Sequence, residues 1–322
     1  MNQLQVSTSA FALDVREGLS ASPKRLPSRY FYDARGSELF REIMRMEAYY
    51  PTRCEYEIFE RQGRELAQAL MAPGGAFQLV EFGAGDGLKT RLLLEALLRR
   101  QAAFAYTPID ISGSELRRLA QALRQEMPQL TVDPLEGEYF EALRRLNQDA
   151  APQRKAILFL GSNIGNFTEP EARTFLDALG DACRPGDLVL IGFDLKKDPR
   201  VILQAYDDPE GITRAFNFNL LSRMNRELGA DFEHSAFDHY ATYDPLSGET
   251  RSYLVSRRRQ TVRIAALELE VDFGAWEPVW VELSQKYDTA LIRSLAEGSG
   301  FRIQRQFTDS KGWFADALLE KV

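Results

Sequence analysis

The stretch EFGAGDG, residues 81–87, decides the fold. It stands where the apolar run at residues 77–82 gives way to a helical pattern that starts at residue 88. Glycines in such a turn let the backbone approach a ligand closely at the carboxyl end of a strand. A dinucleotide-binding loop has its third glycine three residues after the second, but Leu88 stands three residues after Gly85. The stretch therefore does not match hydride-transfer enzymes.

Outward from this turn, short apolar runs alternate with longer helical patterns. We expect strands at residues 77–82, 105–111, 130–135, 155–160 and 187–193, and helices between them at 88–100, 115–125, 140–147 and 170–183. This alternation predicts parallel βαβ units with helices on both faces of the sheet. The fold class is therefore α/β, with a Rossmann-like doubly wound sheet.

After residue 194 the rhythm changes. A helical stretch at 214–228 leads into alternating segments at 235–243, 250–257 and 267–273, which indicates an inserted α+β domain. A helix at 288–297 and strands at 301–307 and 313–319 follow, and we expect these strands to return to the first sheet as an antiparallel hairpin.

Composition excludes several classes of function. The 322 residues carry 40 Lys and Arg against 47 Asp and Glu, a net charge of −7, so we expect no nucleic-acid partner. No apolar run approaches the roughly 20 residues of a membrane span, and no secretory signal is evident at residues 1–9, so we expect a cytoplasmic protein without membrane contact. The few cysteines and histidines argue against disulfides and against a metal site; they are Cys54, Cys183, His234 and His239.

Two carboxylates follow the next strands of the predicted sheet. Asp110 ends the second strand, where it is placed to accept hydrogen bonds from two ribose hydroxyls. Glu138 follows the third strand, beside Tyr139, where it is placed to face an adenine edge. A methyl donor with a sulfonium and no pyrophosphate needs a close backbone turn and these carboxylates. The order of features predicts S-adenosylmethionine as the cofactor.

Several further segments point to one family. They are FYDARGSELF (residues 31–40), YYPTRCE (49–55), KTR (89–91), LGSNIGN (160–166), AYDD (205–208) and VELSQK (281–286). In this order they resemble the histidine-specific methyltransferase family of ergothioneine biosynthesis over nearly the whole chain. The resemblance implies an S-adenosylmethionine-binding methyltransferase domain at 60–197 and 286–322. It implies a substrate-binding domain at 1–59 and 198–285, which closes over the amino acid.

The resemblance also implies roles for individual residues. The cofactor-binding residues would be Gly83, Lys89, Asp110, Glu138 and Tyr139. Tyr32 would be the catalytic residue, near the reacting amine. The substrate carboxylate would be held by Asn166 and Tyr206, and the imidazole would be read by Tyr49, Glu282 and Ser284.

The spacing of Glu282 and Ser284 makes chemical sense, because residues two apart share one face of a strand. A carboxylate and a hydroxyl placed there suit the ring N–H donors of histidine. Two positions depart from the family pattern: Ser252 stands where a methionine lies against the imidazole, and Asn163 replaces a threonine. The pocket wall is therefore expected to be more polar.

The predicted activity is transfer of methyl groups from S-adenosylmethionine to the α-amino nitrogen of free L-histidine, three times, to give the trimethylated betaine hercynine. Positive charge moves from sulfur to nitrogen in each transfer, so the reaction requires no metal. We expect a monomer whose partner is a small-molecule amino acid. Two alternatives stay open: an Nα-methyltransferase for another free amino acid such as tryptophan, and a cofactor-binding module without catalysis.

Overall fold

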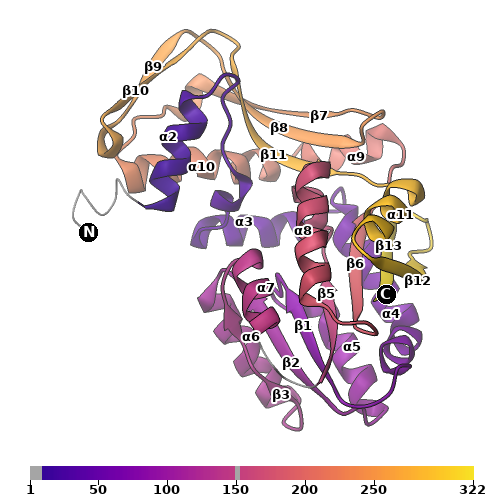
Figure 1. Cartoon of the computed structure of the whole chain (residues 1–322). Helices are drawn as coiled ribbons and strands as arrows, with labels where there is room; N and C mark the ends of the chain where they lie inside the picture. The colour runs from indigo at the N-terminus through magenta and orange to yellow at the C-terminus, as the bar shows by residue number, and fades with distance from the viewer. Residues whose placement is uncertain (1–8, 149–152) are drawn as a thin grey trace. The chain divides into compact units, whose positions relative to one another are not determined.

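The computed structural model describes residues 9–148 and 153–322 (Figure 1). The chain divides into two compact units: Met1–Tyr50 with Lys197–Ser284 (unit 1), and Pro51–Lys196 with Gln285–Val322 (unit 2). The sequence placed the first junction after residue 59, whereas unit 2 starts at the beginning of one long helix, α4 (Tyr50–Met71). What each unit binds stays a prediction.

Unit 2 is built on a sheet with the strand order β12-β13-β6-β5-β1-β2-β3, and β4 also pairs with β2. Its strands are β1 (Phe77–Phe82), β2 (Phe104–Asp110), β3 (Thr131–Val132), β4 (Leu135–Glu136), β5 (Arg154–Phe159), β6 (Leu188–Asp194), β12 (Phe301–Thr308) and β13 (Phe314–Lys321). The first six are parallel, whereas β13 runs antiparallel to β6 and β12 antiparallel to β13. The α/β class and the returning C-terminal hairpin are both confirmed.

The predicted strand at 130–135 is wrong as a single element. Two short strands, β3 and β4, replace it, and Asp133 and Pro134 lie between them. Pro108 of β2 stands opposite this gap and has no backbone N–H to donate across it, so the pairing with β2 is interrupted there. Both short strands pair with β2 in the same parallel register, so β4 continues the line of β3 and leads to Glu138 and Tyr139.

Helices cover both faces of this sheet (Figure 1). They are α4, α5 (Leu88–Arg99), α6 (Gly113–Glu126), α7 (Tyr139–Gln148), α8 (Glu169–Ala182) and α11 (Thr289–Gly298). Val80, Ile157 and Val189 pack against α7, α8 and α11 in one core cluster. On the opposite face, Leu79 and Leu158 are equally buried. Burial on both faces explains why these strands read as continuous apolar runs in the sequence.

Unit 1 combines helices with two small antiparallel arrays. The helices are α2 (Ala10–Ser20), η1 (Ser28–Phe31), α3 (Ala34–Arg45), α9 (Pro199–Tyr206) and α10 (Ile212–Leu228). One sheet has the order β11-β8-β7, formed by β11 (Pro278–Gln285), β8 (Glu249–Ser256) and β7 (Phe237–Tyr243). The other is the hairpin of β9 (Gln260–Ile264) and β10 (Leu269–Phe273). The sequence patterns did not predict α2, α3, α4, α9 or β9.

The core of unit 1 gathers around α10. Phe216, Leu220 and Met224 of this helix are buried in a cluster with apolar residues of α2, α3 and the strands. Every second residue of β8 is buried, as expected of a strand with one face on a core. Among the residues that the structure describes, no helix is long and apolar enough to cross a membrane.

A glycine in β6 generates a stability prediction. A Cβ on Gly192 would lie 2.5 Å from Glu55 Oε1 and 3.1 Å from the Phe314 ring. We expect Gly192→Ala to lower the free energy of unfolding by about 1–3 kcal/mol, because an extra carbon in a packed core forces its neighbours apart. Urea denaturation of the full chain measures this change.

The matched control is Gly63→Ala in α4, where a new Cβ meets nothing within 4 Å. Replacing glycine by alanine inside a helix raises stability by roughly 0.5–1 kcal/mol. Equal effects of the two substitutions would contradict the packing described at Gly192.

Candidate active site

The glycine turn after β1 is held against the end of β2. The backbone N–H groups of Gly83 and Ala84 donate to the carbonyl oxygen of Ile109, at 2.8 and 3.1 Å. Gly85 N–H donates to Asp110 Oδ2 at 3.1 Å, and Ser112 N–H donates to Asp110 Oδ1 at 2.9 Å. The Asp110 carboxylate therefore fixes the turn and also faces the edge at which the parallel strands end.

Gly83 is required by its backbone and by its neighbours. Its φ is +70°, a conformation that residues with a Cβ rarely adopt. A Cβ there would lie 2.9 Å from Asn163 Nδ2 and 3.0 Å from Tyr139 Oη. Since Asn163 begins η2 (Asn163–Asn166) after β5, and Tyr139 begins α7, this turn is the meeting point of three loops at the carboxyl edge of the sheet.

Tyr139 is fixed by ring contacts. It packs edge-on against Phe159 at 5.2 Å and against Phe82 at 5.9 Å between centroids. Burial, together with the nearby charge of Asp110, raises the pKa of its hydroxyl, which therefore stays protonated. Glu138 lies beside it with an exposed side chain. Gly83, Asp110, Glu138 and Tyr139 thus follow consecutive parallel strands of unit 2.

Lys89, the last of the predicted cofactor residues, lies in the first turn of α5. Its ammonium forms an ion pair with Glu55 of α4, and the Glu55 side chain is fully buried. Both Glu55 oxygens also accept a hydrogen bond from Gly161 N–H, at 2.8 and 3.0 Å. One carboxylate therefore positions Lys89 and the loop after β5 together.

A second acid lies beside this pair. Asp316 of β13 is fully buried, and burial together with the Glu55 charge raises its pKa well above the ordinary range. The raised pKa favours the uncharged form of Asp316 beside the ion pair of Glu55 and Lys89. Uncompensated buried charge is costly, so this arrangement avoids a repulsive pair of carboxylates.

The predicted substrate residues of unit 1 come together around β11. The Tyr206 hydroxyl, at the end of α9, donates to Ser284 Oγ at 2.7 Å. Glu282 and Ser284 share one face of β11, as their spacing predicts. The ring of Tyr49 packs edge-on against Tyr206 at 6.4 Å. Tyr49, Tyr206, Glu282 and Ser284 therefore form one group, called here the β11 group.

Ser252 joins the β11 group. It is fully buried on β8, and its hydroxyl donates to Glu282 Oε2 at 2.7 Å. The residue that departs from the family pattern is thus a direct partner of the carboxylate expected to read the substrate. The sequence predicted only that Ser252 makes the pocket wall more polar, and not this contact with Glu282.

Tyr32 connects to the same group through aromatic rings. Its ring packs edge-on against Phe40 at 5.4 Å and against Phe216 at 5.5 Å. Phe40 in turn packs against Tyr49 at 6.2 Å. A continuous row of rings therefore runs from Tyr32 to Tyr206 within unit 1. Asn166 belongs to unit 2, where it ends η2 with an exposed side chain, and its predicted role stays a prediction.

The sequence patterns gave no role to the side chain of Glu55, which supports the loop after β5 and Lys89. Its motif was quoted, but its side chain was not. The sequence carried a signal for a buried role of Glu55. Helical spacing places four residues on one buried stripe of α4: Glu55, Ile58, Phe59 and Leu66. A carboxylate on an apolar stripe predicts a buried partner. Within the described ranges, no group of three or more His, Cys, Asp or Glu side chains is arranged to hold a metal ion.

Comparison with known proteins shows similarity over nearly the whole chain. A family model described as "Histidine-specific methyltransferase, SAM-dependent" matches residues 11–321. The chain is 41% identical over 320 residues to the histidine N-alpha-methyltransferase of Mycolicibacterium smegmatis, covering 98% of this chain and 97% of that protein. It is 39% identical over 312 residues to the protein of the same name from Mycobacterium tuberculosis, covering 97% and 95%.

A relative with another substrate is also similar. The L-tryptophan methyltransferase of Psilocybe serbica is 28% identical over 334 residues, covering 96% of this chain and 92% of that protein.

A buried acid under the glycine turn generates a pH prediction. Burial raises the pKa of Glu81 to about 7, although Tyr106 and Thr90 donate hydrogen bonds to it. Between pH 4.5 and 7 the folded state therefore binds the Glu81 proton more tightly than the unfolded state does, so this residue makes stability fall as pH rises. Glu81→Gln should remove that fall, which amounts to about 3 kcal/mol at 1.36 kcal/mol per pKa unit.

Urea denaturation of both proteins at pH 5 and pH 7.5 measures the effect. The difference in unfolding free energy between the variant and the wild type should shift in favour of the variant at the higher pH. A difference that is constant with pH would contradict the raised pKa.

Proposed function

The chain belongs to the family of histidine-specific, S-adenosylmethionine-dependent methyltransferases, and we propose that it methylates the α-amino nitrogen of free L-histidine. The proposed reaction occurs three times and gives hercynine. The observation that carries the proposal is the match over nearly the whole chain to histidine N-alpha-methyltransferases. Membership of the family also identifies the chain as an enzyme, in place of a cofactor-binding module without catalysis.

The carboxyl edge of unit 2 fits S-adenosylmethionine. A carboxylate offers about four lone-pair positions, so Asp110 can hold the glycine turn and also accept hydrogen bonds from ribose hydroxyls. Glu138 and the ring of Tyr139 are suited to an adenine. Lys89, held by Glu55, supplies a cation for the carboxylate of the methionine moiety. The cofactor, when bound, supplies a methyl group on a sulfonium.

The β11 group supplies anchors for an amino acid. Glu282 and Ser284 can accept hydrogen bonds from the imidazole. The amide of Asn166, and the hydroxyl of Tyr206 once its proton turns away from Ser284, are proposed to donate to the substrate carboxylate. Anchoring by both ends leaves the amine to accept one methyl after another. Tyr32 is proposed to lie beside that amine and to hold it by a hydrogen bond. Because charge is moved and not created, positioning supplies much of the rate.

Tryptophan is the second candidate substrate. Ser252 makes the wall beside Glu282 smaller than a methionine would, and a relative of this chain is a tryptophan methyltransferase. Incubation with labelled S-adenosylmethionine and each of the twenty amino acids, read by mass spectrometry, decides between the two. The mass of the product also gives the number of methyl groups transferred.

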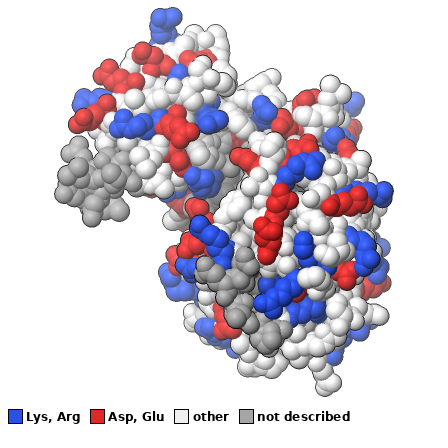
Figure 2. All heavy atoms as spheres, viewed as in Figure 1, with Lys and Arg blue, Asp and Glu red and all other residues white. Residues whose placement is uncertain are grey.

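We also propose a solution state and a location for the protein. The substrate is a small molecule, and we propose that the protein acts as a monomer without nucleic acid. The net charge of −7 supports the latter, and on the face drawn in Figure 2 basic and acidic side chains are interspersed. Cys54 and Cys183 are not joined in a disulfide, which supports the proposal of a cytoplasmic location.

The cofactor assignment is tested by Asp110→Ala. We expect binding of S-adenosylmethionine to weaken by about 100-fold or more, because two hydrogen bonds to a charged acceptor are lost at roughly 1.5–3 kcal/mol each. Calorimetry on the folded variant measures the affinity. Asp133→Asn, an exposed acid beyond β3, is the control and should bind normally. Unchanged affinity in Asp110→Ala would refute the assignment.

The substrate assignment is tested by Glu282→Ala. We expect histidine to bind about 10-fold to 100-fold more weakly, because its ring donor loses a charged partner. Binding of S-adenosylmethionine should stay nearly intact. Removing the carboxylate should also relax discrimination against tryptophan, since the wild-type pocket would leave Glu282 without a partner around an apolar ring.

Ser252→Ala is the matched variant for Glu282→Ala. It removes one hydrogen bond to the carboxylate and keeps the charge, so we expect a loss of only a few-fold in histidine affinity. Histidine affinity that is unchanged in Glu282→Ala, or a wild type that prefers tryptophan, would overturn the histidine assignment.

A further inference from the structure

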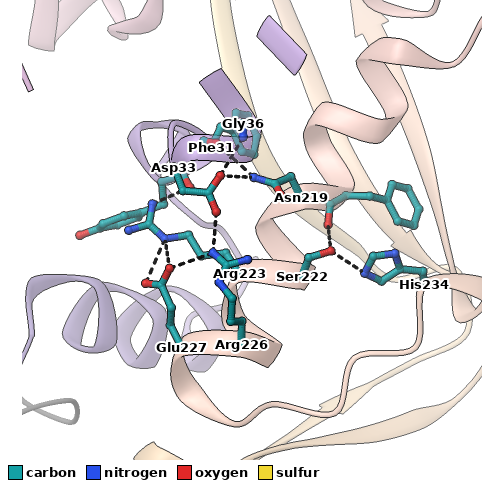
Figure 3. A network of polar contacts seen from close by, with 11 residues as sticks. Phe31, Asp33, Gly36, Asn219, Ser222, Arg223, Arg226, Glu227 and His234 are labelled. Atoms are coloured by element: carbon teal, nitrogen blue, oxygen red, sulfur yellow. Dashed lines mark hydrogen bonds and ion pairs between the residues drawn. The ribbon is translucent and has the colours of Figure 1, made fainter. Parts of the chain in front are cut away.

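The residues on both sides of Tyr32 are tied to one helix, α10 (Figure 3). Asn219 Nδ2 donates to the carbonyl oxygen of Phe31 at 3.4 Å and to Asp33 Oδ1 at 2.8 Å. Arg226 donates to Asp33 Oδ2 at 2.5 Å. Arg223 donates to the carbonyl oxygen of Tyr30 at 2.9 Å. Residues 30, 31 and 33 are therefore all held by α10.

Residue 32 itself meets the same helix. The ring of Tyr32 packs edge-on against Phe216 of α10. Four residues of α10 make these contacts: Phe216, Asn219, Arg223 and Arg226. Their spacing of i, i+3, i+7 and i+10 places them along one face of the helix, called here the α10 stripe.

Tyr32 stands at a sharp turn of the chain. Its φ of −88° and ψ of 56°, with a hydrogen bond of 3.1 Å from Asp33 N–H to the Phe31 carbonyl oxygen, form an inverse γ-turn. In a three-residue turn, the direction of the central side chain is set by the positions of the two outer residues. Those outer residues are the ones that Asn219 holds.

The turn is closed from the other side by the start of α3. Asp33 Oδ1 caps this helix by accepting a hydrogen bond from Gly36 N–H at 2.7 Å. A Cβ on Gly36 would lie 1.6 Å from the Phe31 carbonyl oxygen, so only glycine lets the chain fold back so tightly. The Asp33 carboxylate thus joins α3, the turn and α10 at one point.

We propose that Asn219 and Arg226, acting through Asp33, are positioning residues that aim the Tyr32 ring for methyl transfer. They bind neither S-adenosylmethionine nor histidine. The inference rests on the proposed role of Tyr32 beside the amine. Because a misplacement of about 1 Å at a reacting group costs about 100-fold in rate, loosening the turn should slow turnover more than it weakens binding.

The variants are Asn219→Ala, which removes both hydrogen bonds to the turn, and Arg226→Gln, which removes the ion pair to Asp33. Arg226 is half-exposed, so Arg226→Gln keeps the test valid if Asn219→Ala fails to fold. We expect kcat to fall about 10-fold to 100-fold, with the Kd of S-adenosylmethionine changed by no more than about twofold. Arg35→Gln is the control, since Arg35 pairs only with exposed Glu38 and Glu42 in the contacts described and should keep the wild-type kcat.

A double-mutant cycle with Tyr32→Phe separates positioning from general loss of structure. If the α10 stripe acts through Tyr32, Asn219→Ala or Arg226→Gln costs little further rate in the Tyr32→Phe background. Suppose that Tyr32→Phe slows turnover. If the α10 variants then keep the wild-type rate, or if their loss of rate multiplies in full with the loss from Tyr32→Phe, the positioning proposal is overturned and the role of Tyr32 stands. If Tyr32→Phe itself keeps the wild-type kcat, the role of Tyr32 fails and the positioning proposal fails with it.

Discussion

The buried carboxylate of Glu55 is the interaction on which unit 2 depends. It joins α4 to Lys89 of α5 and to the backbone of the loop after β5, and it lies against Gly192 of β6. A charge in such a place is tolerated only when it is paired and hydrogen-bonded, and removing one partner of a buried pair costs on the order of 3–5 kcal/mol. The carboxylate therefore fixes where the loops at the edge of the sheet can lie.

Unit 1 uses a carboxylate in a comparable way. Asp33 receives donors from α3 and α10, and it holds a turn in place. In both units an acid gathers backbone and side-chain donors from elements that are distant in the sequence. A methyl transfer that moves charge without creating it depends mainly on orientation. Rigid support behind the contacting residues is the kind of structure that such a reaction requires.

The motifs that resemble the family contain residues with different roles. FYDARG contains Tyr32, proposed to contact the amine, but also Asp33 and Gly36, which shape the turn around it. YYPTRCE contains Tyr49 of the β11 group in unit 1 and also Glu55, which supports loops of its own unit, unit 2. A short motif can thus combine one residue that meets the ligand with others that hold it in place.

The sequence by itself determined the features that depend on local spacing. The apolar runs fixed the parallel strands of unit 2, the glycines fixed the turn after β1, and the last two strands were recognised as a returning hairpin. Period-two spacing placed Glu282 and Ser284 on one strand face. Such patterns follow from the geometry of a single helix or strand, so neighbouring residues are enough to reveal them.

Only the tertiary structure decided which distant groups meet. The contacts of Glu55 with Gly161, of Ser252 with Glu282 and of Asn219 with the turn at Tyr32 join segments far apart along the chain. The raised pKa of Asp316 depends on burial beside Glu55, which no local pattern expresses. Hydrogen bonds and pKa values depend on distance in space and on the exclusion of water, and both arise only when the chain has folded.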